Sequence, residues 1–421
     1  MFSFLKHPEI RKKLLFTLFV LFLFRLLTNV PAPGVSRTAV SSFLANSQLL
    51  GIYDLFSGGG LQSFSIITLG LGPYINASII LQLFTTMVPA LEELSKEGEQ
   101  GREKINQYTR MLTIPLTLLQ AYGVYFLLQR QNIIPHLEPM ALLVLIFTFT
   151  AGVFLLMWLG DLVTEYGLGN GISLLIFAGI ISQLPSTTTQ LLASAQSNGF
   201  SDIIIMGVVG LLVIYGVVNI NEGTRNIPVE YGRRGSRTSN VPVKNHLPLK
   251  VNQAGVIPII FAVSVVIVPS LIGPVLAASR LELFRGIGQF LVVNFTQTSL
   301  LYNLFYFLLV FGFTFFYTTM QFNPEKIADD LKRRGGFIPG IRPGKATERY
   351  LKNILYRITL SGALFLGIVA IFPYIMQVTF DVNSNLAIGG TGLLIVVSVV
   401  LDTVRQVESM VVTRNYESFL T

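Results

Sequence analysis

The sequence has no cysteine, a single tryptophan, three histidines and few charges for its length. Without cysteine, disulfide scaffolds, thiol catalysis and thiolate metal sites are excluded. Charged residues make up 12% of the 421 residues, where soluble domains usually carry about 25%. Hydrophobic residues make up 52%, too many for polar surface to cover a soluble core. The composition excludes a cytosolic enzyme and a disordered chain, and it predicts a protein that lipid surrounds over much of its length.

Ten apolar stretches are long enough to cross a bilayer as helices. A hydrocarbon core of about 30 Å needs roughly 20 apolar residues. The predicted spans are residues 14–30, 72–89, 111–129, 141–160, 170–184, 202–220, 254–277, 300–320, 354–374 and 387–405. The first follows the basic sequence KHPEIRKK, but no small-residue cleavage site follows it. We therefore interpret it as a retained helix and not as a signal peptide.

Basic residues are concentrated in alternate connections between these spans. The N-terminus and the loops at 90–110, 221–252 and 321–352 hold most of them, while the intervening connections hold only four arginines. The positive-inside rule therefore places these loops, and both termini, on the cytoplasmic side. The loops at 221–252 and 321–352 are also long for connections between neighbouring helices.

The connection between the first two spans is not polar. It contains FSGGGLQSFSIITLGLG, which is too rich in glycine for a good helix and too apolar for a solvated loop. Irregular backbone at membrane depth persists only where protein buries it or where it lines a cavity. We expect this segment to fold back inside the helical bundle.

No catalytic, cofactor or metal motif is present, so the chain is not expected to be an enzyme. The sequence GIRPGKAT imitates a phosphate-binding loop, but three residues, not four, separate Gly340 from Gly344, and Ala346 replaces the Ser or Thr. A secondary solute transporter stays an alternative, because glycine and proline interrupt several spans. Against it, the spans hold few ionisable residues, with Arg25 in the first span and Asp161 near the end of another.

Two aliphatic pairs have helical spacing. Leu71 and Ile75, like Ile172 and Ile176, are four residues apart and so share a helix face. Core packing is one interpretation. The other is a hydrophobic constriction, which gives ions nothing to replace their hydration shell and makes no directional bonds to a passing chain.

Several long motifs, in order along the chain, resemble the SecY family, the central subunits of bacterial-type protein-translocation channels. They are LFSGGGLQSFSIITLGLGPYINASII, EGEQGREKINQYTR, GLGNGISLLIFAGI, HLPLKVNQAGVIPIIFA, FNPEKIADDLKRRGGFIPGIRPGKATERYL and GGTGLLIVV. The resemblance implies an all-α polytopic membrane protein with ten transmembrane helices. These would form an hourglass channel of two inverted five-helix halves, at 1–185 and 201–421. The implied function is a protein-conducting channel that passes unfolded preproteins and releases signal or transmembrane segments laterally into lipid.

The resemblance also assigns residues to the parts of the channel. The family's pore ring falls on Leu71, Ile75, Ile172, Ile176, Ile260 and Ile395. Its plug, a short helix that seals the funnel, corresponds to about 53–66 and includes Leu55, Phe56, Ser57, Gly58, Gly59 and Gly60. Its lateral gate lies between the second and seventh helices, where the candidate polar contacts are Asn76, Ser78, Asn252 and Gln253. Ordinary interhelical hydrogen bonding is the alternative role of those four residues.

The resemblance further implies partners and a location. The two long basic loops correspond to cytoplasmic protrusions that dock the ribosome, through ribosomal RNA, and the SecA motor ATPase. The docking candidates are Arg233, Arg234, Arg237, Arg342 and Lys345. A SecE-type clamp helix and a SecG-type subunit are the expected small partners. The expected location is the plasma membrane, with the plastid thylakoid membrane as the alternative.

Overall fold

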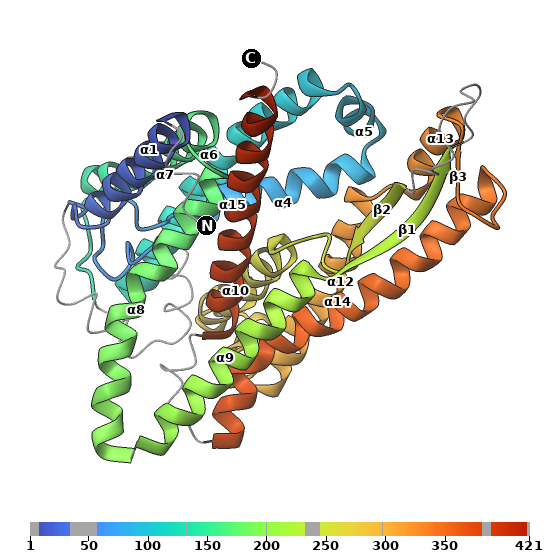
Figure 1. Cartoon of the computed structure of the whole chain (residues 1–421). Helices are drawn as coiled ribbons and strands as arrows, with labels where there is room; N and C mark the ends of the chain where they lie inside the picture. The colour runs from blue at the N-terminus through green and yellow to red at the C-terminus, as the bar shows by residue number, and fades with distance from the viewer. Residues whose placement is uncertain are drawn as a thin grey trace, which may run out of the picture. The chain divides into compact units, whose positions relative to one another are not determined.

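A computed structural model describes residues 8–33, 57–130, 133–198, 200–231, 245–296, 298–380 and 389–418. The chain is mainly helical (Figure 1). The helices are α1 (Pro8–Leu27), α4 (Gly72–Met87), α5 (Pro89–Lys96), α6 (Glu99–Arg130), α7 (Pro139–Tyr166), α8 (Gly171–Asn198), α9 (Phe200–Glu222), α10 (Ile257–Ala277), α11 (Glu282–Asn294), α12 (Leu300–Gln321), α13 (Pro324–Arg333), α14 (Lys345–Phe380) and α15 (Gly389–Ser418).

Each of the ten predicted spans overlaps one of these helices. Within the described ranges, the helices α6, α7, α10, α12 and α14 are long and apolar enough to cross a membrane. The pair α4 and α5, bent by 100°, makes a sixth candidate, and α8 and α9 contribute the shorter apolar stretches Gly171–Pro185 and Gly207–Glu222. The span expected at 170–184 does not end at Pro185, because α8 continues through it to Asn198.

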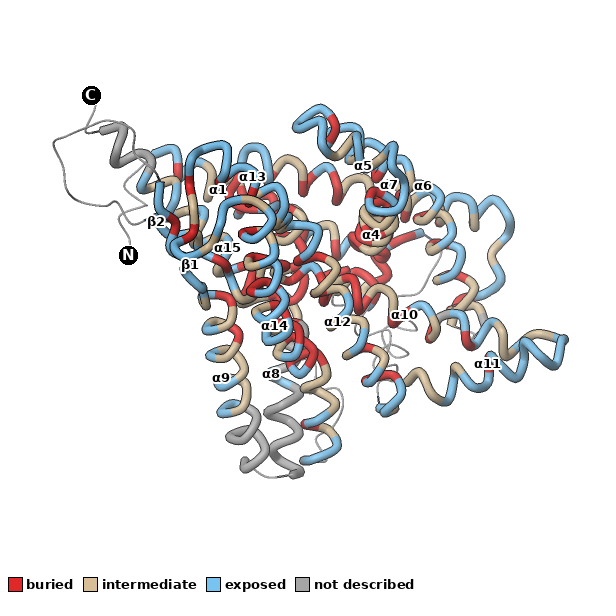
Figure 2. Tube along the Cα trace, turned by 90° about the vertical axis from the view of Figure 1, so that its right-hand side faces the viewer, coloured by how far each residue is buried: buried red, intermediate tan, exposed pale blue. Residues whose placement is uncertain are grey.

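The helices of the predicted spans are buried on one face and apolar on the other. On α7, Leu145, Phe149 and Val153 are fully buried, whereas Phe147 and Trp158 are more than 60% exposed. Apolar side chains on the outward face suit a helix that lipid surrounds. Figure 2 shows this mixture of buried and exposed positions along the trace; α11 is instead exposed or intermediate over nearly its whole length.

The chain groups into two compact units. Unit 1 comprises Met1–Ile204, Val382–Ile388 and Ile395–Thr421, and unit 2 comprises Ile205–Asp381 and Gly389–Leu394. The resemblance places all of α15 in the C-terminal half, but by contacts most of this helix groups with unit 1.

A small antiparallel sheet in unit 2 was not predicted. Its strands are β1 (Thr224–Tyr231), β2 (Asn245–Lys250) and β3 (Gly336–Phe337), in the order β2-β1-β3. Thr224 pairs with Lys250 at one end of β1, and Glu230 pairs with Phe337 near the other. The two long basic loops therefore share one sheet (Figure 1).

Candidate functional site

The apolar segment 57–71, which we call the inner segment, lies in unit 1 and consists mostly of turns. It pairs with the chain that follows α1. The amide of Ala32 donates to the carbonyl of Phe64 at 2.8 Å, and the amide of Ile66 donates to the carbonyl of Val30 at 3.0 Å. These bonds satisfy backbone groups that no helix serves. The prediction of irregular backbone buried in the bundle is confirmed for this segment.

Helix α7 contacts the inner segment at two positions, through the ring of Phe149 and at Gly152, which has no side chain. The Phe64 ring meets the Phe149 ring edge-on, with centroids 5.4 Å apart, a favoured aromatic geometry. One turn further along α7, a Cβ on Gly152 would overlap the carbonyl oxygen of Ile66. The backbone of the inner segment therefore lies directly against the backbone of α7.

The beginning of the inner segment packs on α1. Gly58 and Gly59 have φ values of 69° and 84°, which glycine adopts without the Cβ penalty. A Cβ on Gly58 would also collide with the ring of Phe24. The Arg25 guanidinium donates to the carbonyl of Gly58 at 3.4 Å. Arg25, in the first predicted span, thus contacts the inner segment.

The short helix expected for the plug is not formed by residues 58–66. Residues 58–66 form turns, and the Ser57 hydroxyl oxygen accepts a hydrogen bond from the amide of Leu61 at 3.1 Å. Leu55 and Phe56 lie outside the described residues. The positive φ values of Gly58 and Gly59 exclude a right-handed helix at these two residues.

Five of the six aliphatic residues assigned to the pore ring belong to unit 1. Leu71 and Ile75 stand at the start of α4, where the amide of Ile75 donates to the carbonyl of Leu71 at 3.0 Å. Both are buried, as are Ile176 on α8 and Ile395 on α15, whereas Ile172 is half-buried. The expected one-turn spacing of the two pairs is confirmed by their helices.

The sixth residue, Ile260, lies in the first turn of α10 in unit 2. It is half-buried, and its carbonyl accepts a hydrogen bond from the Ser264 hydroxyl at 2.9 Å. All six aliphatic side chains are buried or half-buried. Their convergence on one constriction stays a prediction from the resemblance.

Of the polar gate candidates, Asn252 has the best-defined partners. Its amide nitrogen donates to Asn221 Oδ1 at 2.8 Å and to the carbonyl of Gly255 at 3.2 Å. Both asparagines are buried, while Gln253 is half-buried. Asn221, near the end of α9, was missed by the sequence reasoning, because a partner 31 residues away leaves no local signal. The bond joins α9 to the chain just before α10, inside unit 2.

The candidates on α4 have weaker contacts. Asn76 and Ser78 are both half-buried. The Ser78 hydroxyl lies 3.5 Å from the amide nitrogen of Gln82 on the same helix, at the limit of hydrogen-bond length. A gate role for either residue stays a prediction.

The loop before α14 presents Arg342. Gly340 and Gly344 have φ values of 79° and 101° and flank it on both sides. The carbonyl of Arg342 accepts a hydrogen bond from the Thr347 hydroxyl at 3.0 Å, which ties the loop to the first turn of α14. The side chains of Arg342 and Lys345 are exposed. A guanidinium on a fixed loop is suited to phosphate or carboxylate, which its planar fork binds with two hydrogen bonds.

An apolar core lies beneath this loop. It consists of the buried residues Ile227, Leu249, Ile338, Leu351 and Ile354. These residues come from β1, β2, the chain after β3, and α14, so the two basic loops form one folded unit, which we call the basic module (residues 224–231, 245–250 and 324–354). Arg233, Arg234 and Arg237 lie outside the described residues.

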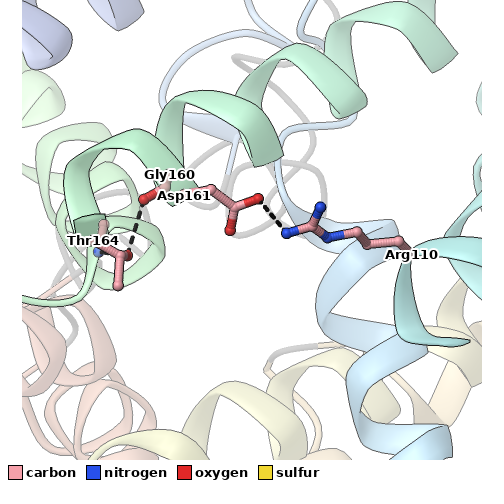
Figure 3. A network of polar contacts seen from close by, with 5 residues as sticks. Arg110, Gly160, Asp161 and Thr164 are labelled. Atoms are coloured by element: carbon pink, nitrogen blue, oxygen red, sulfur yellow. Dashed lines mark hydrogen bonds and ion pairs between the residues drawn. The ribbon is translucent and has the colours of Figure 1, made fainter. Parts of the chain in front are cut away.

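An ion pair that the sequence reasoning did not predict joins α6 to α7. Arg110 and Asp161 approach to 2.7 Å, with side chains 47% and 42% exposed (Figure 3). One turn further, the Thr164 hydroxyl donates to the carbonyl of Gly160 at 3.0 Å and accepts from the amide of Gly171 at 2.9 Å. The turn between α7 and α8 is therefore fixed by side-chain bonds from α7.

The motif GLGNGIS forms this turn. The Asn170 side chain accepts a hydrogen bond from the amide of Ser173 at 3.2 Å and so caps α8. Gly169 has a φ of 78°. The amide of Leu168 donates to the Thr17 hydroxyl at 3.0 Å, which links the turn to α1. The motif thus positions the start of α8, and with it Ile172 and Ile176.

No group of three or more His, Asp or Glu side chains in the described part of the chain could hold a metal ion. Unit 1 offers buried aliphatic side chains and a buried irregular segment, and unit 2 offers the basic module.

The helices and the buried inner segment define a polytopic helical membrane protein, and solved structures share this fold. A protein-conducting channel matches with a TM-score of 0.64 and 21% identity, covering 96% of both chains. A SecY protein studied for its plug domain matches with a TM-score of 0.67 and 20% identity, also over 96% of both chains. Sec61 in the canine ribosome-channel complex matches with a TM-score of 0.63 and 20% identity, over 96% of both chains.

Relatives with higher identity come from bacteria. Protein translocase subunit SecY of Streptomyces scabiei is 41% identical over 432 residues, covering 99% of this chain and 98% of the relative. The subunits of Corynebacterium glutamicum and Thermotoga maritima are 42% and 41% identical, over 99% of this chain and 98% and 96% of theirs. The SecY family model matches residues 65–404. The chain belongs to the SecY family.

Proposed function

We propose that this chain forms a protein-conducting channel that passes unfolded preproteins across a membrane and releases apolar segments sideways into lipid. The observation that carries this proposal is the 41% identity with named protein translocase subunits over 99% of the chain. The family is one of channels and not of catalytic enzymes. The comparisons give no support to the solute-transporter alternative.

The pore is closed to ions by aliphatic side chains. The residues that form this ring are Leu71, Ile75, Ile172, Ile176, Ile260 and Ile395. The partial or complete burial of all six supports the proposal. An ion that enters such a constriction loses hydration without compensation, whereas an unfolded chain of any sequence meets no directional bond that would retain it.

The plug comprises about residues 53–66 and blocks the resting channel. In its described part, the Arg25 guanidinium donates to the carbonyl of Gly58 at 3.4 Å. Phe64 and Ile66 are joined by backbone bonds to Ala32 and Val30 in the chain after α1. These contacts support a plug that rests against α1 and the chain after it, and that must leave them when the channel opens.

The lateral gate lies between α4 and α10. Asn76 and Ser78 supply polar groups on α4, and Asn252 and Gln253 supply them just before α10. The Asn252–Asn221 bond supports a role of Asn252 in fixing the start of α10 to α9. A signal peptide would replace polar contacts across the gate by apolar contacts with its own helix.

The basic module docks the cytoplasmic partners that drive translocation. Arg342 and Lys345, together with Arg233, Arg234 and Arg237, bind the SecA ATPase and ribosomal RNA. The exposure of Arg342 on a loop fixed by Thr347 supports this role, and Sec61 of the canine ribosome-channel complex has the same fold. SecE-type and SecG-type subunits complete the channel, which lies in a bacterial plasma membrane with both termini in the cytoplasm.

Reconstitution tests the function. Vesicles that contain the chain with a SecE-type subunit are given SecA, ATP and a preprotein, and protease-protected preprotein is measured. Protection that requires ATP and this chain is expected, and the control omits the chain. Vesicles with intact complex that protect no preprotein, but take up a small solute along an ion gradient, would overturn the proposal.

A further inference from the structure

Helix α11 is tethered to the membrane at both ends. Residues 278–281 connect it to α10, and residues 295–299 connect it to α12. Both neighbouring helices are long and apolar enough to cross the membrane. A fully extended residue spans at most about 3.5 Å, so the two connections reach roughly 14 and 18 Å. α11 therefore stays close to the membrane surface at which α10 ends.

The contacts between α10 and α11 fix their direction. A Cβ on Gly288 would overlap the backbone of Ala277, the last residue of α10. Two turns further along α11, the carbonyl of Phe295 accepts a hydrogen bond from the hydroxyl of Ser270, two turns earlier in α10. The two helices thus run antiparallel and in backbone contact. The second half of α11, from Gly288 onward, lies beside the last two turns of α10, and residues 282–287 extend beyond Ala277.

One face of α11 is apolar and uncovered in the described chain. Leu283, Ile287 and Phe290 are spaced by four and three residues and form one stripe. Their side chains are 71%, 45% and 54% exposed. A second stripe, at the same spacing, is polar over its first half, where Glu282, Arg285 and Gln289 are exposed, and it ends in the exposed Val292 and Val293. Ile287 and Gln289 are about 200° apart around the helix.

We propose that α11 is an interfacial membrane helix whose apolar stripe (Leu283, Ile287 and Phe290) inserts among the acyl chains of the leaflet at which α10 ends. A helix with one apolar and one polar face, held at the surface, is suited to the boundary between headgroups and acyl chains. Ile272 and Val275, on the paired turns of α10, are 45% and 50% exposed. The stripe thus continues the lipid-facing surface of a spanning helix. This inference does not depend on the proposed channel function.

The cysteine-free sequence allows a direct test with single labels. Ile287→Cys and Gln289→Cys are each labelled with an environment-sensitive fluorophore in the full chain with its partner subunits. The complexes are reconstituted into phosphatidylcholine vesicles, some with lipids that carry a nitroxide near the top of the acyl chain. We expect nitroxide lipid to quench the label at 287 several-fold more than the label at 289. Iodide, present on both sides of the membrane, should show the opposite preference.

Two further labels calibrate the experiment. Leu304→Cys, 53% exposed on α12, reports a lipid-facing span, and Lys352→Cys, exposed on α14, reports an aqueous position. Equal quenching of the 287 and 289 labels by iodide would place α11 in water. Protection of the 287 label from both quenchers would place a protein partner on the stripe. Either result overturns the proposal. Phe290→Cys, on the same stripe, serves if Ile287→Cys fails to fold.

Discussion

Replacing Gly152 by alanine tests how the inner segment is held. The added Cβ would overlap the carbonyl oxygen of Ile66 and lie 2.9 Å from its carbonyl carbon. A backbone carbonyl cannot turn aside as a flexible side chain can, so the inner segment or α7 must shift. Such overpacking typically costs about 1–3 kcal/mol. The nearby bond from the amide of Ile66 to Val30 contributes roughly 1 kcal/mol that the same shift puts at risk.

Gly123 provides the matched control for this substitution. It lies inside α6, also in unit 1, and a Cβ there meets no atom within 4 Å. Alanine inside a helix stabilises by about 0.5–1 kcal/mol relative to glycine. We therefore expect Gly152→Ala to lower the midpoint of thermal unfolding of the detergent-solubilised complex, and Gly123→Ala to leave it equal or higher. Equal midpoints for the two variants would refute the close backbone packing of α7 against the inner segment.

The remaining predictions concern the pore, the docking loop and the start of α10. Ile75→Asn should raise the ion conductance of the resting channel in planar bilayers, and Ile75→Leu should not; a parental conductance for both would count against the ring. Arg342→Glu should reduce SecA-driven transport more than membrane insertion, whereas Arg349→Glu, on the exposed side of α14, should affect both little. Asn221→Ala should lower the free energy of unfolding by about 1–3 kcal/mol, because it leaves the buried amide of Asn252 without its 2.8 Å partner; an unchanged unfolding midpoint would show that the bond contributes nothing.

Hydropathy and local motifs were sufficient to predict the helices and the buried inner segment. The stretch expected at 141–160 lies within α7, because a run of apolar residues long enough to span lipid has few alternatives to a helix. The inner segment was predictable for a related reason: its composition suits neither a helix nor a solvated loop. The attachment of the inner segment to α7 was not predictable, because a glycine at position 152 does not by itself show which backbone segment packs against that glycine.

Contacts between residues far apart in sequence could not be predicted. Arg110 and Asp161 are 51 residues apart, and an exposed pair of this kind contributes only about 0–1 kcal/mol. Such a pair does not require any particular sequence around either residue, so no sequence pattern reveals it. The signal present, a cation at the start of one span and an anion at the end of the next, indicates only that both lie near the same membrane surface.

The sheet of the basic module was missed for a definite physical reason. Pro228 lies in β1 and Pro248 lies in β2, and proline, which cannot donate a ladder hydrogen bond, argues against a strand. The alternation of buried Ile227 and Val229 with exposed neighbours was the opposing signal. The sheet tolerates both prolines because its stability comes from the apolar core shared with α14 and not from a complete ladder.

That core has a consequence for the loop of Arg342. Ile338, four residues before this arginine, is 2% exposed and packs with residues of β1, β2 and α14. The loop is thus short and anchored at both ends, by Ile338 on one side and by the Thr347 bond on the other. In the proposed docking role, an arginine on such a loop would lose little backbone entropy when it binds a partner, since the order is already present before binding. An unstructured connection of about thirty residues could carry the same charge, but it would have to become ordered each time a partner bound. The fold of the basic module therefore explains how a long loop can hold one guanidinium group in a fixed position.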